Sequence, residues 1–169
     1  NANPSIVAES LEPATEITKT LVETLSDGAV LSFGLESADP TVHEQNWLNC
    51  DPQQLKTAVR LVNEHGRGRG ERGLPKLLPG LNFIAGLNGE TEESYQMNLE
   101  LLRSMREEGL WLRRINIRQV EGQGFQKIPE QAFSEFKREV REGIDRPLLE
   151  EMLPIGTLLR GVWWEAHDD

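Results

Sequence analysis

The stretch Ala29-Val30-Leu31-Ser32-Phe33-Gly34-Leu35 is the part of the sequence that decides the fold. It is short and almost entirely apolar, which is typical of a strand buried on both faces of a parallel sheet. Residues 76–84 and 112–120 are two further expected strands, and residues 158–164 are a candidate for a fourth. Strands of this kind predict an α/β protein.

Helical patterns separate these strands. Apolar residues recur at helical spacing over residues 13–25, 52–65, 91–108 and 129–142, and a short helix is expected from Asp39-Pro40. No hairpin signals join the strands, so the order of elements predicts βαβ crossovers and a parallel sheet. Either a segment of a β/α barrel or a doubly wound sheet fits this order.

Composition and charge exclude several classes of protein. The chain has 169 residues, about one domain, and carries 28 Asp and Glu against 18 Lys and Arg. This acidity disfavours nonspecific binding to nucleic acid or anionic membranes. No apolar run approaches the roughly 20 residues that cross a bilayer. A single cysteine, Cys50, excludes an internal disulfide framework, so we expect a cytoplasmic protein with Cys50 as a small buried residue.

Polar residues follow the expected strands at the edge where parallel sheets bind ligands. The segments are Glu36-Ser37, residues 86–91 and residues 118–124. Arg114, Asn116 and Arg118 alternate with isoleucines, so they share one face of their strand, which in a barrel is the interior. Buried arginines need acidic partners or an anionic ligand, and the sequence leaves both explanations open.

Three segments resemble motifs of the radical S-adenosylmethionine (radical SAM) enzymes. Residues 33–40, Phe-Gly-Leu-Glu-Ser-Ala-Asp-Pro, resemble the fourth-strand motif of that family. Residues 82–91 resemble the fifth-strand motif, which usually reads Gly-Leu-Pro-Gly-Glu-Thr; Asn88 replaces its proline, a departure expected to loosen the turn. Residues 113–120 resemble the sixth strand of an uncharacterised archaeal-type group. The resemblance implies half of a TIM-like (β/α)6 barrel.

This resemblance also implies a cofactor and a reaction. Radical SAM enzymes use a [4Fe-4S] cluster to cleave S-adenosylmethionine (SAM) into methionine and a 5′-deoxyadenosyl radical. Their cluster is bound by a Cys-x3-Cys-x2-Cys loop. This chain has no such loop, so we expect it to hold no metal and to be inactive alone, with an unknown substrate.

Site residues follow from the resemblance one by one. Glu36 and Ser37 would lie near the ribose or methionine part of SAM; the alternative is a helix cap and a surface carboxylate. Gly86 and Gly89 would let the backbone approach the adenosine, or would simply form a strand-to-helix turn. The remaining assignments are apolar contacts from Ile84 and Leu87, cofactor contacts from Arg118 and Val120, and substrate contacts from Arg114 and Asn116.

The domain prediction treats the chain as a fragment. Asn1-Ala2 resembles the remnant of a cleaved tag, and residues 3–169 would be the C-terminal half of a barrel whose parent chain extends at both ends. Exposed strand edges predict self-association. A noncatalytic half-barrel that binds other proteins is the alternative function. Residues 65–73, rich in arginine and glycine, are expected to form a solvated loop opposite the active site, and nucleic acid is not an expected partner.

Overall fold

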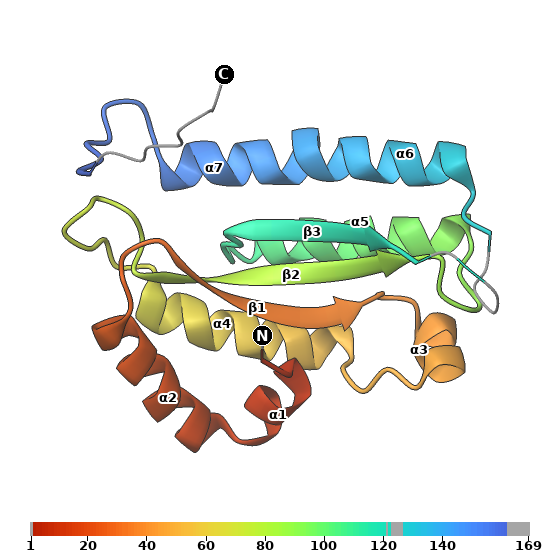
Figure 1. Ribbon diagram of the computed structural model, residues 1–169, viewed down its shortest axis with the longest axis horizontal. Helices are drawn as coiled ribbons and strands as arrows, with labels where there is room; N and C mark the ends of the chain where they lie inside the picture. The colour runs from red at the N-terminus through yellow and green to blue at the C-terminus, as the bar shows by residue number, and fades with distance from the viewer. Residues whose placement is uncertain (1, 121, 123–126, 162–169) are drawn as a thin grey trace.

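A single parallel sheet organises the fold, which is known from a computed structural model that describes residues 2–120, 122 and 127–161 (Figure 1). Its strands are β1 (Ala29–Glu36), β2 (Leu77–Ala85) and β3 (Arg114–Gln119), in the order β1-β2-β3. The helices are α1 (Pro4–Glu9), α2 (Leu11–Thr24), α3 (Pro40–Asn46), α4 (Pro52–Gly66), α5 (Glu92–Glu107), α6 (Glu130–Glu139), the π-helix η1 (Val140–Asp145) and α7 (Arg146–Met152). The predicted α/β class and parallel sheet are confirmed.

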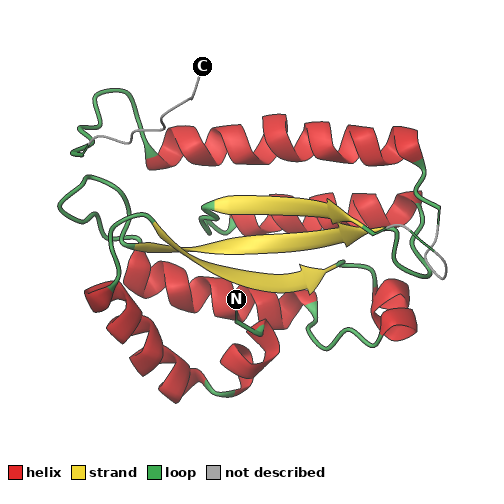
Figure 2. Cartoon of the chain, viewed as in Figure 1, coloured by secondary structure: helices red, strands yellow, loops and turns green. Residues whose placement is uncertain are grey.

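Helices cover one face of the sheet, with α4 and α5 behind the strands in the view of Figures 1 and 2. Phe33 and Phe83 point into this layer and are at most 1% exposed. Phe136 of α6 meets Phe83 edge-on at 5.9 Å and stacks on Tyr95 of α5 at 5.4 Å between ring centroids. One apolar core therefore joins β2, α5 and α6.

The outer edge of β1 is partly occupied by the first described residue of the chain. Ala2 donates its N–H to the Ser32 carbonyl at 2.9 Å and forms a parallel bridge with Phe33. Asn3 then caps α1, accepting the N–H of Ser5 at 3.0 Å. Ala2 was expected to belong to a tag remnant, and no helix was expected over residues 4–9. Both nevertheless take part in the fold.

An apolar groove lies between α1, α2 and β1. Helix α2 forms where the pattern predicts it, but Ile17 remains 61% exposed and Ile6 of α1 is equally exposed. The groove has a volume of about 370 Å³ and is lined by Ala2, Ile6, Val7, Ser10, Pro13, Ala14, Ile17, Thr18, Leu21 and Leu31. Ile17 of the predicted apolar stripe of α2 thus faces this groove rather than the core.

The last helical segment is longer than predicted, because α6 continues through η1 into α7. Pro147 has no N–H to donate to the carbonyl four residues earlier, and its ring crowds that carbonyl. The carbonyl belongs to Gly143, and it accepts the Arg106 guanidinium of α5 at 3.3 Å instead. The helix adjusts by widening to a π-turn, a common response to an interrupted bonding ladder.

The candidate fourth strand over residues 158–164 is wrong for its described part. Residues 158–161 have no strand structure, and residues 162–164 lie outside the described part of the chain. Arg160 donates its N–H to the Arg72 carbonyl at 3.0 Å, so this segment lies against a loop rather than beside a strand. Among the described residues, no helix is long and apolar enough to cross a membrane.

Candidate functional site

The face of the sheet away from the helices is polar. A side chain added at Gly80 would meet Val30 and Ser32, which places these side chains on that face. Strand register sets two rows across it, Ser32–Gly80–Arg114 and, one step nearer the carboxyl edge, Gly34–Asn82–Asn116. Asn116 donates its amide N–H to Asn82 Oδ1 at 2.8 Å, so the two asparagines of the second row are hydrogen-bonded to each other.

Glu36 reaches this face through an irregularity at the end of β1. The register shifts between Gly34 and Glu36, so Glu36 pairs with Phe83 and Leu35 becomes the extra residue of a bulge. Glu36 has a φ of 71°, a left-handed conformation that costs energy for a residue with a side chain. A Cβ at Gly34 would collide with Glu36 Oε1, so the carboxylate folds back over that glycine. Bulges commonly re-aim a side chain in this way.

The Glu36 carboxylate lies in surroundings that disfavour its ionised form. Its Oε2 atom is buried and has no hydrogen-bond partner among the described residues. Burial raises the pKa of the Glu36 carboxyl, and the positive charge of Arg118 partly offsets that rise. A buried oxygen left without a donor costs free energy, which a ligand with a positive or hydrogen-donating group would recover.

Ser37 is used by the turn that follows β1. The side chain is 3% exposed, and its hydroxyl accepts the N–H of Asp39 at 3.1 Å. Asp39 caps α3 by accepting the N–H of Thr41 at 2.8 Å, and its other oxygen accepts the Ser94 hydroxyl of α5 at 2.5 Å. Asp39 rather than Ser37 is therefore the helix cap, and the Ser37 hydroxyl is buried within the turn.

The turn after β2 is closed by a buried carboxylate. Glu90 is 4% exposed, and its Oε2 accepts the N–H groups of Gly86 at 2.8 Å and Leu87 at 3.3 Å. Gly86 and Gly89 have φ values of 94° and 79°, which glycine adopts without strain. The glycines thus build a tight turn, and the N–H groups of Gly86 and Leu87 are taken by Glu90.

Asn88 does not loosen this turn, so that expectation is wrong. The side chain of Asn46 in α3 donates to the Asn88 carbonyl at 2.8 Å and accepts the Asn88 N–H at 3.2 Å. A proline at position 88 has no N–H and would lose the second bond. The turn after β2 is therefore clamped to the helix after β1, a pairing that sequence spacing could not reveal.

The other predicted residues also gather at the carboxyl edge. Ile84 is half-buried and lies opposite Arg118 in the register, while Leu87 is 8% exposed. Val120 donates its N–H to the Ala85 carbonyl at 2.9 Å and so extends the pairing by one residue. Of the predicted ligand-binding segment 118–124, residues 121, 123 and 124 lie outside the described part.

Arg114 and Arg118 are exposed and have no acidic partner in contact. No ion pair or side-chain hydrogen bond of either guanidinium is found among the described residues. Arg118 lies close enough to Glu36 for the two charges to influence each other. Of the two explanations left open by the sequence, pairing with core carboxylates therefore receives no support from the described residues.

Cys50 is buried, as predicted, and does not contribute to this edge as a ligand. It is 4% exposed within the main core, and its thiol donates to the Asp51 carbonyl at 3.3 Å. Burial, with a smaller contribution from the Asp51 charge, raises the pKa of the thiol to about 12, far from the thiolate that iron requires. In the described part, no group of three or more His, Cys, Asp or Glu side chains could hold a metal ion.

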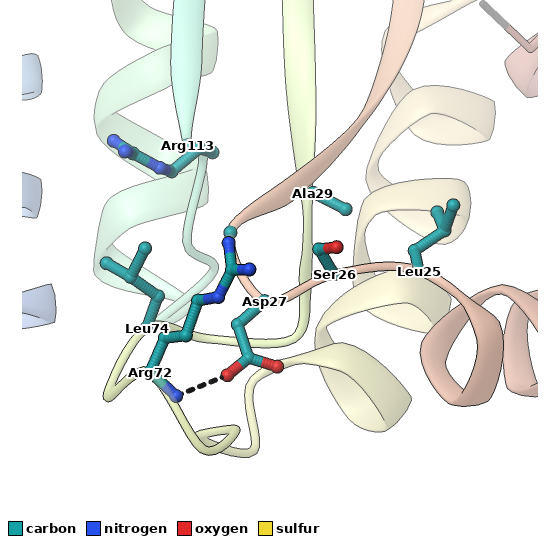
Figure 3. A pocket seen from close by; sticks show the side chains of 8 residues that line it. Leu25, Ser26, Asp27, Ala29, Arg72, Leu74 and Arg113 are labelled. Carbon is teal, nitrogen blue, oxygen red and sulfur yellow. Dashed lines mark hydrogen bonds between the residues drawn. The ribbon is translucent and has the colours of Figure 1, made fainter. Parts of the chain in front are cut away.

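The opposite edge of the sheet carries a second set of charges around Asp27. Its side chain is 5% exposed, forms an ion pair with Lys76 at 2.9 Å and accepts the Arg72 N–H at 2.7 Å (Figure 3). An open pocket of about 520 Å³ lies there, lined by Leu25, Ser26, Asp27, Gly28, Ala29, Arg72, Leu74 and Arg113.

The arginine- and glycine-rich loop at this edge is largely exposed, as predicted, and two of its arginines also bond to the rest of the protein. Arg67 lies over the Trp111 ring at 3.9 Å and donates to the Gly109 carbonyl at 3.0 Å. Arg69 donates to the carbonyls of Gly73 and Met152, each at 2.6 Å. Two of its arginines therefore hold protein segments together, and the loop lies opposite the carboxyl edge, as expected.

Comparison with known proteins finds two long archaeal relatives. The chain is 42% identical over 166 residues to an uncharacterized protein of Archaeoglobus fulgidus, covering 92% of this chain and 31% of that protein. It is 39% identical over 178 residues to an uncharacterized protein of Methanocaldococcus jannaschii, covering 99% and 33% respectively. No protein-family profile matches the chain. The chain thus spans about a third of the length of these relatives.

Proposed function

We propose that this chain is the second half of a radical SAM barrel and that its carboxyl edge binds SAM. The observation that carries the proposal is Glu36, a strained residue near the cation of Arg118, whose buried oxygen has no donor in the described part of the chain. Strained backbone and unpaired buried charge cluster at functional sites, and this edge is where parallel sheets bind ligands.

The charges of Glu36 and Arg118 suit the amino-acid end of SAM. That end carries an ammonium and a carboxylate, so Glu36 would accept the ammonium while Arg118 donates to the carboxylate. Ile84 and Leu87 would supply apolar contacts to the adenosine. In this arrangement the chain's own residues bind and orient the cofactor.

A [4Fe-4S] cluster does not fit this chain by itself. The sequence has one cysteine, and its thiol is buried and held in the neutral form. We propose that the cluster ligands come from a segment that corresponds to the other two thirds of the longer relatives. The cluster would supply the electron that cleaves SAM, which suits a reducing cytoplasmic location.

One observation favours the alternative of a noncatalytic interaction module. The groove between α1, α2 and β1 exposes Ile6 and Ile17, and apolar surface of this kind is common at interfaces between proteins or domains. Such a module would need neither a cluster nor the charges at the carboxyl edge. The two proposals therefore differ in whether the unmatched part of the relatives contains cluster-binding cysteines and whether those proteins cleave SAM.

The test uses the full-length M. jannaschii relative. Three closely spaced cysteines are expected in the two thirds that this chain does not match. The protein would be reconstituted anaerobically with iron and sulfide, reduced with dithionite and assayed for 5′-deoxyadenosine from SAM. Formation that stops when those cysteines are replaced supports the proposal. Absence of the cysteines would contradict it and favour the interaction module.

A further inference from the structure

Arg114 is the cation on the polar face that the proposed cofactor site does not use. It stands in the row Ser32–Gly80–Arg114, and no described carboxylate contacts its guanidinium. The chain as a whole has a net charge of −10, so acidic side chains are abundant. Arg114 is exposed on the face that carries the proposed site, yet none of these acidic side chains is its ion-pair partner among the described residues.

Arg114 lies at the start of β3 and Arg118 near its end. The two residues are four positions apart on β3, which corresponds to roughly 13 Å between their backbones. The hydrogen-bonded amides of Asn82 and Asn116 occupy the row between them. Arg114 and Arg118 can therefore contact two different molecules, one on each side of these amides.

The surroundings of Arg114 leave room only for small neighbours. A Cβ at Gly80, its partner on β2, would lie 2.8 Å from Val30 Cγ1 and 3.1 Å from the Ser32 hydroxyl oxygen. Glycine is therefore required at this position of β2, and no side chain from Gly80 can cover or neutralise Arg114. The Arg114 cation therefore lies beside a shallow part of the sheet surface formed by Gly80, Val30 and Ser32.

We propose that Arg114 binds an anionic group, a carboxylate or a phosphate, of the substrate that reacts at this site. This inference rests on the proposed function, since it assigns the end of the face near Arg118 to SAM and the row that contains Arg114 to a second molecule. The planar guanidinium suits such groups because it can donate two parallel hydrogen bonds. The paired amides of Asn82 and Asn116 would lie between the cofactor and this anion.

The test is a titration of the chain with inorganic phosphate and, separately, with acetate at constant ionic strength. The side-chain N–H signals of the arginines are followed by NMR. The Arg114 signal is expected to shift saturably with at least one anion, and the stronger anion distinguishes phosphate from carboxylate. Arg114→Gln should weaken this binding by about fivefold or more, since a charge-assisted hydrogen bond is lost. Equal, linear shifts of all arginines would overturn the inference.

Two variants make the result specific. Arg138→Gln removes the same charge from the outer helix α6, where the Arg138 side chain is 61% exposed and pairs with its neighbour Glu139 at 3.8 Å, so anion binding should persist. Arg114→Lys keeps the charge but loses the planar fork, and it should bind less tightly than wild type. If Arg138→Gln weakens anion binding as much as Arg114→Gln, net charge is responsible and the inference fails.

A parallel titration with SAM separates this inference from the proposed function. Wild type and Arg114→Gln should bind SAM with similar affinity, because Arg118 and Glu36 lie two rows away. Loss of SAM binding in Arg114→Gln would overturn the substrate assignment. Failure of the wild-type chain to bind SAM, with phosphate or acetate still bound at Arg114, would instead count against the proposed function.

Discussion

The two edges of the sheet use their charged residues in opposite ways. At the amino-terminal edge, the Asp27 carboxylate is matched by Lys76 and by a backbone N–H, and Arg69 donates to carbonyls. At the carboxyl edge, Glu36 has a buried oxygen without a donor and Arg118 contacts no carboxylate among the described residues. Matched charges hold segments together, whereas unmatched charges are available to a ligand.

The largest expected effect comes from removing the Glu36 charge. Glu36→Gln should lower the affinity for SAM by about tenfold or more, because the carboxylate is proposed to accept the cofactor ammonium. Isothermal titration measures this change. Glu44→Gln, an exposed residue of α3, is the matched control and should bind SAM like wild type. Equal binding by Glu36→Gln and wild type would contradict the assignment.

The same variant should not reduce stability at neutral pH. Burial raises the folded-state pKa of Glu36, so its ionised form opposes folding. This cost is absent below the ordinary carboxyl pKa and appears as the pH rises through the raised value. Glu36→Gln should therefore match wild type in acid and melt at the same or a higher temperature at pH 7. A lower melting temperature would indicate a structural role.

Asp27→Asn should give the opposite pattern at the other edge. The Arg72 N–H and the Lys76 ammonium hold the pKa of Asp27 below its usual value, so the carboxylate stabilises the fold above that usual value. This stabilisation is lost as the pH falls below about 4. We expect a lower melting temperature at pH 7, a difference that shrinks in acid, and unchanged SAM affinity.

Glu71→Gln, in the loop that also carries Arg72, is the control for Asp27, since Glu71 is exposed. Thermal melts followed by circular dichroism across the acid range measure both variants. A pH-independent loss of stability in Asp27→Asn would show that shape, rather than charge, matters at this position.

Gly34→Ala should disturb the carboxyl edge without unfolding the protein. The added methyl collides with the Glu36 carboxylate, the far end of a flexible side chain that can move away. We expect SAM affinity to fall by roughly threefold to tenfold, the range of a displaced hydrogen-bonding group, with little change in melting temperature. Gly68→Ala, which meets nothing within 4 Å, is the control. Unchanged affinity in Gly34→Ala would place the carboxylate outside the site.

Asn46→Ala should have the smallest effect. It removes both hydrogen bonds to Asn88 and should cost about 1 kcal/mol of stability, as is usual for partly exposed bonds. Amide hydrogen exchange should become faster at Asn88. Asn49→Ala, an exposed position in the following loop, should leave this exchange unchanged. No change in Asn46→Ala would mean that the clamp contributes little in solution.

Much of the fold could be predicted because its signals are local. The helix predicted over residues 52–65 begins at Pro52, where Asp51 supplies a capping box. The extension through η1 was missed, since its cause combines Pro147 with a carbonyl bonded by Arg106 of another helix. Residues 158–161 have an apolar pattern but form no strand, because strand formation requires a neighbour that the pattern cannot supply.

The candidate site was predictable in position but not in detail. Alternation placed Arg114, Asn116 and Arg118 together, and the strand ends placed Glu36 beside them. The conformation of Glu36 depends on a bulge set by pairing with β2, which no local pattern encodes. Ser37 was assigned to the cofactor, yet its hydroxyl bonds Asp39 within the turn, a choice decided by packing.

The most direct test of the central claim is to titrate the isotopically labelled chain with SAM and map the amide shifts by NMR. Saturable shifts should concentrate at Glu36, residues 84–90 and Arg118, with the Asp27 edge unaffected. Shifts that concentrate around Asp27 and Arg72, or no saturable shifts at millimolar SAM, would contradict the claim that the unmatched charges of the carboxyl edge form the ligand site.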